Sequence, residues 1–185
     1  MHYYKLIVII FLVCTITLPG SVLQKIIRDF IVKYFKVSVQ ELEYFEINNP
    51  IGYTIDQPIS SLKQTLAFIF LPFIICTLIC VLLTFPFQAI GLFGITDDRI
   101  IFIFLLLVWI GISAGIYALP DQEALINLDI QLDKTKVNIW LYSFLRLTII
   151  IFKFMTCFRF NSLIYAFAIS YFLPWLFGFK GQLFT

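Results

Sequence analysis

The sequence predicts an all-α membrane bundle of 4–5 transmembrane helices, with a small cytoplasmic β-hairpin between spans one and two. Of its 185 residues, 61% are hydrophobic and only 13% are charged, whereas soluble domains are about half apolar and about a quarter charged. The mean hydropathy of +0.98 on so short a chain is typical of a polytopic membrane protein. Several apolar runs also reach the ~20 residues that a helix needs to cross a bilayer. We therefore interpret residues 1–185 as one integral membrane domain.

The first apolar run, residues 6–22, follows a short head that contains Lys5. A cleaved signal peptide is the alternative interpretation of this run. We favour a retained span, because no small-x-small cleavage site follows it and Pro19-Gly20 leads directly into further helical spacing. Residues 24–36 repeat apolar side chains at helical intervals with charged residues on the opposite face, which predicts an amphipathic helix.

Residues 37–56 are expected to form the β-hairpin. Polar residues alternate with β-branched and aromatic ones over 37–48, turn-forming residues occupy 48–52, and 51–56 predicts a second short strand. The outer strand of such a hairpin can accept an extended peptide by strand addition. The alternative is that the hairpin only caps the bundle.

The remaining spans are predicted from four further apolar runs. A Pro-broken run and a clean run come first, and two runs separated by a tight turn at 159–161 complete the set, giving spans at about 65–93, 100–119, 139–158 and 162–179. The total is five spans, or four if the last two form one bent hairpin in the membrane. No internal repeat is detectable, so a stand-alone transporter is a poor interpretation.

The orientation of the spans follows from the positions of lysine and arginine, because cytoplasmic loops carry an excess of these residues. With five spans, one side receives Lys25, Arg28, Lys33, Lys36, Lys63, Lys134, Lys136 and Lys180. The other side receives Lys5, Arg99 and Arg159. The sequence therefore places the 24–63 segment, the 120–138 loop and the C-terminus in the cytoplasm.

Two basic residues, Arg146 and Lys153, lie inside the fourth predicted span and share a face because they are seven residues apart. Charged residues within spans usually pair or face a cavity. We favour the simpler interpretation that their long side chains reach toward the membrane surface. Asp129 and Asp133, one turn apart in the preceding segment, are expected to belong to a solvated face.

Several kinds of chemistry are excluded by residue type. His2 is the only histidine, so no Ser-His or Cys-His nucleophile pair is available. The basic residues form no patch with interleaved aromatics, which argues against a nucleic-acid partner. The four cysteines all lie in apolar runs and are expected to be packing residues rather than disulfides or ligands: Cys14, Cys76, Cys80 and Cys157.

Four stretches occur in an order that resembles the site-2-protease-like intramembrane zinc metalloproteases. They are "PGSVLQKIIRDF" (19–30), "NPIGYTIDQP" (49–58), "FIFLPFIICTLICVLL" (68–83) and "WIGISAGIYALPDQEAL" (109–125). In that family, a helix after a Pro-Gly carries His-Glu-x-x-His. A Gly-Tyr-x-x-His segment, a Pro-broken span and an "HAxPS" segment with a following acidic residue come later. The resemblance covers about residues 10–130.

The positions that match the metal motif carry other residues here. The three motif positions hold Gln24, Lys25 and Arg28, the next two histidine positions hold Asp56 and Tyr117, and the acidic residue is Asp121 or Glu123. A catalytic zinc needs three protein ligands, and a guanidinium stays protonated and cannot ligate. The resemblance therefore implies a degenerate member, for which we expect no catalytic residue, metal or cofactor. The alternative is a carboxylate-only site from Asp56, Asp121 and Glu123 that holds a hard cation weakly.

In place of the metal we expect an ion pair that joins Arg28 or Lys25 to Asp121 or Glu123. The function that follows is non-catalytic: the chain binds or positions another membrane protein. An active metalloprotease with an atypical site, and an accessory subunit of a larger membrane complex, are the alternatives. The expected partners are the lipid bilayer and either another membrane protein or an extended peptide at the hairpin edge.

Overall fold

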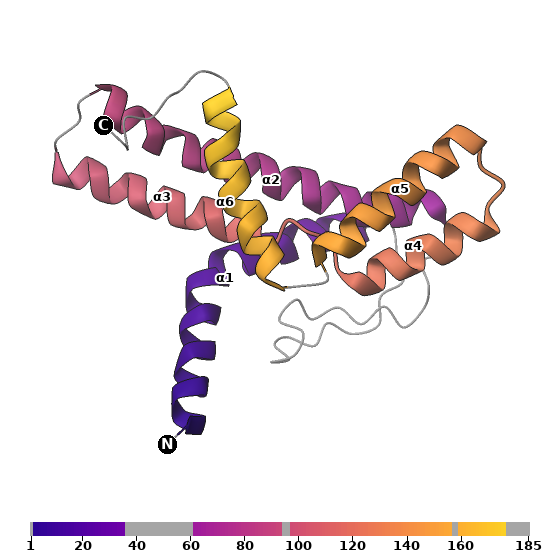
Figure 1. The fold of residues 1–185 in the computed structure, drawn as a ribbon, viewed down its shortest axis with the longest axis horizontal. Coiled ribbons are helices and arrows are strands. Elements are labelled where there is room, and N and C mark those ends of the chain that lie inside the picture. Colours follow the sequence, from indigo (N-terminus) through magenta and orange to yellow (C-terminus); the bar gives the residue numbers. More distant parts are fainter. Residues whose placement is uncertain (1, 36–60, 94–96, 157–158, 177–185) are drawn as a thin grey trace.

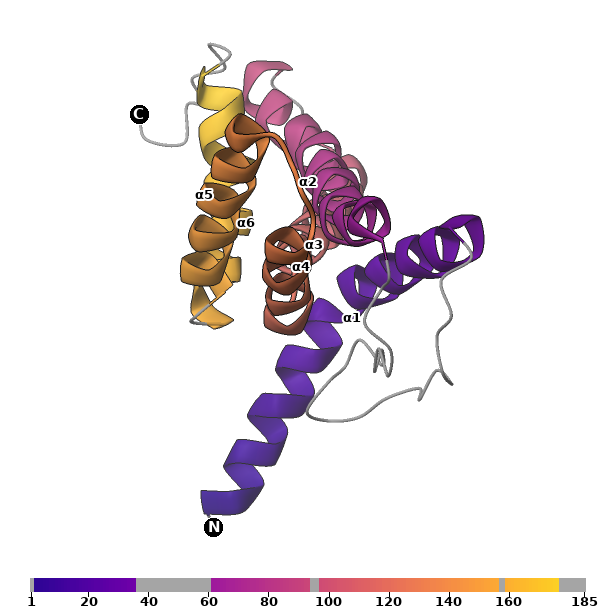
Figure 2. The same ribbon diagram turned by 90° about the vertical axis from the view of Figure 1, so that its right-hand side faces the viewer.

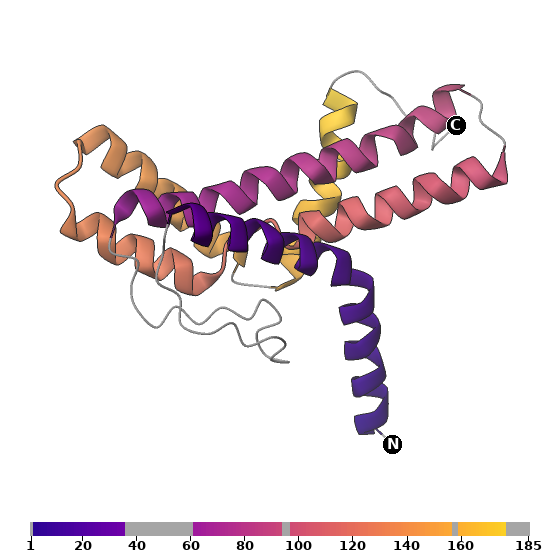
Figure 3. The same ribbon diagram turned by 180° about the vertical axis from the view of Figure 1, so that it is seen from behind.

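Six helices form the described part of the chain, which in this computed structural model comprises residues 2–35, 61–93, 97–156 and 159–176 (Figure 1). In chain order they are α1 (His2–Phe35), α2 (Leu62–Phe93), α3 (Asp98–Ile116), α4 (Gln122–Lys134), α5 (Ile139–Thr156) and α6 (Arg159–Leu176). Figures 1 and 3 show α2 and α3 side by side in opposite directions, with α4 and α5 forming a helical hairpin at one end of α2.

The predicted fold class is wrong in its β component. Every regular element among the described residues is a helix, and no strand occurs within these ranges. Residues 37–56, which were expected to form the hairpin, lie outside the described residues, so the fold is helical as far as it is described. The turn expected at 159–161 is also wrong, because these residues form the first turn of α6.

Three of the described helices are long and apolar enough to cross a membrane. They are Leu62–Pro86 within α2, Asp98–Ile116, and Ile139–Thr156. These segments correspond to the predicted spans 65–93, 100–119 and 139–158. The outward faces of these helices carry large exposed apolar side chains, which on α2 include Leu71, Ile74, Leu78 and Leu82. Apolar surface of this kind is what a lipid environment covers.

Helix α3 packs closely on two neighbours through two glycines spaced four residues apart. A Cβ on Gly115 would lie 2.8 Å from the Cys80 sulfur and 2.9 Å from Cβ of Ala166, so no side chain fits between α3, α2 and α6. A Cβ on Gly111 would lie 3.0 Å from Cγ2 of Thr84. Small residues at this spacing allow helix backbones to approach closely. Cys80 is buried and free, as expected of a packing residue.

Helix α1 is one element that contains Pro19, and Figures 1 and 2 show that it is sharply bent. Proline removes a backbone donor and clashes with the preceding turn, which bends a helix. The hydroxyl of Ser113 on α3 lies at this region: it accepts a 2.7 Å hydrogen bond from Gly20 N–H and donates one of 2.9 Å to Thr17 C=O. The side chain from α3 therefore satisfies backbone groups that the bend exposes.

After the bend, α1 is apolar on two sides. Ile27 and Ile31 are buried against α2, where they pack with Phe68 and Cys76. Ile26 and Phe30 point outward and are exposed. The predicted amphipathic helix 24–36 thus exists, but its apolar residues divide between the core and the outer surface.

The second core cluster lies between α4, α5 and the first half of α2. The buried side chains that α4 and α5 contribute include leucines, one isoleucine and one phenylalanine: Leu125, Leu128, Leu132, Leu145, Ile149 and Phe152. Phe152 also stacks edge-on against Phe73 of α2, with ring centroids 5.0 Å apart. The α4–α5 hairpin is therefore anchored to α2 through one continuous apolar layer.

Candidate functional site

The candidate site lies where α1 meets the turn between α3 and α4. Helix α3 ends at Ile116, and Tyr117 caps it with φ −92° and ψ 5°. The chain then passes Pro120, and Asp121 adopts an extended conformation before α4 begins. The missing donor of proline and its steric restriction of the preceding residue prevent α3 from continuing into α4. This turn carries Tyr117 and Asp121 toward α1.

An ion pair joins the two sides of this site. Nη2 of Arg28 donates a 2.6 Å hydrogen bond to Oδ2 of Asp121, and the two side chains are 4% and 40% exposed. The guanidinium carbon also lies 5.2 Å from the centroid of the Phe68 ring. The expected ion pair is therefore confirmed, with Arg28 as the cation and Asp121 as the anion. A charge this deeply buried is tolerated only when it is paired.

Gln24 lies one turn before Arg28 on the same buried face of α1. Its side chain is 1% exposed, and among the residues that the structure describes neither Nε2 nor Oε1 of its amide has a hydrogen-bond partner. Leaving a buried polar group unsatisfied costs about 1–3 kcal/mol. The amide is thus a polar group placed in the interior at a cost to stability.

The other matched positions are distributed around this pair. The Tyr117 hydroxyl shares a 3.2 Å hydrogen bond with Oγ1 of Thr17, close to the α1 bend. Lys25 is half-buried, and Glu123 is exposed in the first turn of α4. Asp56 lies outside the described residues. The structure therefore joins Arg28 to Asp121, with Gln24 one turn away on α1, and joins Tyr117 to a different part of α1.

No group of three or more histidine, cysteine, aspartate or glutamate side chains within the described ranges could hold a metal ion. Of the two acids at the start of α4, Asp121 pairs with Arg28 and Glu123 is exposed. The carboxylate set that the sequence suggested would also need Asp56, which is not among the described residues.

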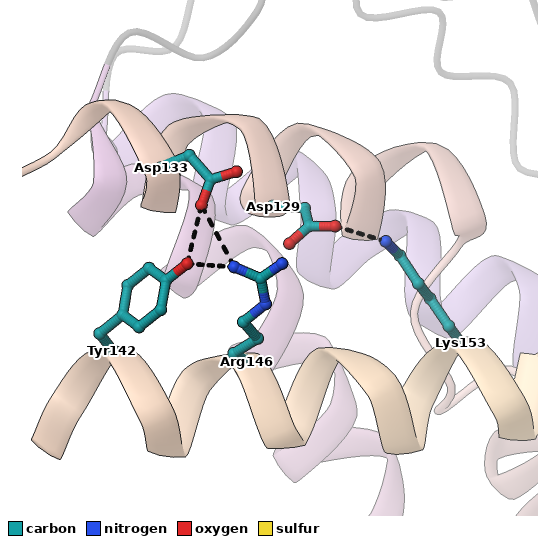
Figure 4. A network of polar contacts seen from close by, with 5 residues as sticks. All are labelled: Asp129, Asp133, Tyr142, Arg146 and Lys153. Atoms are coloured by element: carbon teal, nitrogen blue, oxygen red, sulfur yellow. Dashed lines mark hydrogen bonds and ion pairs between the residues drawn. The ribbon is translucent and has the colours of Figure 1, made fainter. Parts of the chain in front are cut away.

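A second polar network joins α4 to α5 (Figure 4). Nζ of Lys153 donates a 2.6 Å hydrogen bond to Oδ2 of Asp129. Nη1 of Arg146 lies 3.6 Å from Oδ1 of Asp133. The Tyr142 hydroxyl donates to the same carboxylate at 3.0 Å and accepts a hydrogen bond from Arg146. The network therefore pairs both basic residues of α5 with acids of α4.

This network bears on two expectations. Arg146 and Lys153 each pair with an acid of α4, so Asp129 and Asp133 are not only solvated. That the two basic side chains reach toward the membrane surface stays a prediction. The sequence gives the spacing of these residues, but not which face of α4 meets α5. The acids are spaced four residues apart and the bases seven, on adjacent segments joined by a short loop, and antiparallel helices align such residues.

No family model, no characterised protein and no solved structure matches this chain. The resemblance to intramembrane metalloproteases therefore remains a prediction from the sequence.

Proposed function

We propose that this chain is a multi-pass membrane protein that binds another membrane protein and is a non-catalytic relative of the site-2-type metalloproteases. The observation that carries the proposal is the Arg28–Asp121 pair, in which the arginine side chain is buried. The resemblance aligns both residues with positions of one metal site, and residues of one site must meet in space. They do meet, 93 positions apart in sequence, and the cation at the meeting point is a guanidinium.

The guanidinium argues against hydrolysis at this site. A guanidinium offers only hydrogen-bond donors and no acceptor, so it cannot ligate a metal. Its positive charge also opposes a divalent cation beside it, because charges of like sign repel strongly away from bulk water. Asp121, which contacts it, already offsets that charge. The geometry therefore supports a structural role for this interior.

The membrane location is supported by the three apolar helices and their exposed outer faces. We extend this to a multi-pass topology in which the end of α1 and the α4–α5 loop face the cytoplasm. The extension rests on the lysine and arginine distribution along the chain.

The binding surface that we propose is the outer ridge of α1. It consists of four apolar side chains spaced four residues apart and exposed by 44% to 65%: Leu18, Val22, Ile26 and Phe30. Rows of this spacing are the ridges that fit into the grooves of a second helix. The adjacent row on α1 carries Lys25 and Asp29. Charged residues make this surface a poor match for acyl chains alone, so we assign it to a helix of another membrane protein.

Site-specific photo-cross-linking in native membranes tests this surface. A photoreactive residue in place of Phe30, and separately of Ile26, is expected to give one discrete protein adduct of the same mass. The matched control is Leu78 on the outer face of α2, which is 56% exposed and should give lipid adducts only. Lipid adducts at all three positions would contradict the binding role.

Metal content tests the absence of hydrolytic chemistry independently. The protein is purified in mild detergent, freed of loosely bound metal, and zinc per chain is counted by elemental mass spectrometry. We expect far less than one zinc per chain. One zinc per chain that is lost in Asp121→Asn would overturn the non-catalytic assignment.

A further inference from the structure

Three helix ends meet at one end of the molecule. Nε2 of Gln64, in the first turn of α2, donates a 3.0 Å hydrogen bond to the carbonyl oxygen of Phe35, the last residue of α1. Oγ1 of Thr65 donates a 2.8 Å hydrogen bond to Oε1 of Gln131 near the end of α4. Figures 1 and 3 show the same arrangement, with the α4–α5 connection beside the start of α2. Segments that are up to about a hundred positions apart in the chain thus form one surface.

Four exposed lysines gather on these segments, which we call the lysine end: Lys33, Lys63, Lys134 and Lys136. The nearby acid Asp133 pairs with Arg146 and so does not offset them. The opposite end of the α2–α3 pair carries Asp97, Asp98 and Arg99, all exposed. Among the residues that the structure describes, the long axis of the bundle therefore has a basic end with four exposed lysines and an opposite end with two acids and one arginine.

Exposed aromatic side chains accompany the lysines. Trp140, in the first turn of α5, is 82% exposed, and Tyr34, in the last turn of α1, is 71% exposed. Tryptophan and tyrosine favour the boundary between acyl chains and headgroups. Lysines beside them can reach the phosphates while their methylene stems remain in apolar surroundings.

We propose that the lysine end binds the anionic lipid headgroups of one membrane leaflet. The inference rests on the proposed membrane function and specifies the lipid class that this end recognises. Each ammonium offers three hydrogen-bond donors to phosphate oxygens, and basic residues next to a span are attracted to a negatively charged leaflet. Two observations point to headgroups: the lysines come from three helix ends that meet at one end of the molecule, and the exposed Trp140 follows Lys134 and Lys136 at the start of α5.

Fluorescence quenching of Trp140 by brominated lipids tests the proposal. A variant with Trp109→Phe and Trp175→Phe leaves Trp140 as the reporter. It is reconstituted into vesicles that contain lipid brominated near the headgroup, either phosphatidylglycerol or phosphatidylcholine. We expect the anionic lipid to quench at a lower mole fraction than the zwitterionic one. High salt should reduce this preference, because it screens exposed charges.

Matched substitutions locate the preference. Lys63→Gln is expected to lower the ratio of the affinities for the anionic and the zwitterionic lipid about fivefold. Adding Lys134→Gln and Lys136→Gln should bring this ratio close to one. Arg99→Gln removes the same charge at the opposite end and should leave the preference unchanged. All variants should float with the vesicles in a density gradient.

The possible outcomes separate this inference from the membrane assignment. Equal quenching by both lipids, with the protein floating with the vesicles, would overturn the lysine-end proposal and leave the membrane function standing. A preference that falls as much in Arg99→Gln as in Lys63→Gln would also overturn it, because the effect would then reflect net charge. A protein that neither floats nor is quenched by either lipid would refute the membrane function itself.

Discussion

Two Arg–Asp pairs in this molecule use the same chemistry in opposite surroundings. In the Arg28–Asp121 pair the arginine side chain is 4% exposed, whereas in the Arg146–Asp133 pair it is 52% exposed. A buried charge loses its hydration and depends on its partner, while an exposed pair gives little net stability. The two pairs should therefore respond very differently to the loss of one partner, although each joins two packed elements of the bundle.

The largest effect is expected from Asp121→Ala. This change leaves the Arg28 guanidinium buried without its carboxylate, which should lower the free energy of unfolding by about 3–5 kcal/mol. Unfolding by SDS titration from mild detergent measures it. Exchanging the charges, with Arg28→Asp and Asp121→Arg together, should recover part of the loss relative to Arg28→Asp alone. Arg28→Asp with Glu123→Arg is the control and should recover nothing, because Glu123 does not form the pair.

The next largest effect is expected at the contact between Gly20 of α1 and Ser113 of α3, which positions α1 for the Arg28–Asp121 pair. A Cβ on Gly20 would lie 2.0 Å from the backbone oxygen of Ser113. Gly20→Ala should therefore push α1 away from α3 and lower the free energy of unfolding by about 1–3 kcal/mol, as overpacking does. The neighbouring Ser21→Ala is the control, since the Ser21 hydroxyl donates to Leu18 C=O within its own helix. Equal melting temperatures for the two variants would contradict the close α1–α3 contact.

A smaller effect of opposite sign is expected at Gln24. Gln24→Met removes a buried amide that has no partner among the described residues and keeps a similar volume, so it should raise the free energy of unfolding by about 1 kcal/mol. Gln64→Met is the matched control. The Gln64 amide donates to Phe35 C=O, so its loss should lower stability. If Gln24→Met destabilises the protein as much as Gln64→Met, the Gln24 amide has a function that requires its polarity.

The Arg28–Asp121 pair and the α4–α5 hairpin also show what the sequence could predict. Hydropathy placed the apolar helices well, because the length of an apolar run is a local property: the span predicted at 100–119 is α3, Asp98–Ile116. The Arg28–Asp121 pair was predicted through the resemblance, which supplied the long-range contact that spacing alone cannot give. The β component of the predicted fold class was wrong, since the elements that the structure describes are all helical.

The α4–α5 pairs were missed for a physical reason. Which face of α4 meets α5 depends on how Leu125 and Leu128 pack under the hairpin, and the sequence of α5 alone gives no such information. From the sequence, Asp129 cannot be distinguished from a solvated acid unless the face of α4 that packs against α5 is known. The burial of Gln24 was missed in the same way, because a glutamine next to charged residues has no local signal of burial.

The smallest effect is expected at the α4–α5 hairpin itself. A double-mutant cycle of Lys153→Met and Asp129→Asn should give a coupling energy below about 1 kcal/mol, because both side chains are partly exposed, by 40% and 31%. The coupling should also fall in high salt, since exposed charges are screened. A coupling energy above about 2.5 kcal/mol that does not fall in high salt would contradict an exposed Lys153–Asp129 pair. Placing a charged side chain costs that much free energy only within the hydrocarbon of the bilayer. The salt dependence therefore fixes where along the membrane normal the hairpin lies, at the headgroups with the lysine end or within the acyl chains.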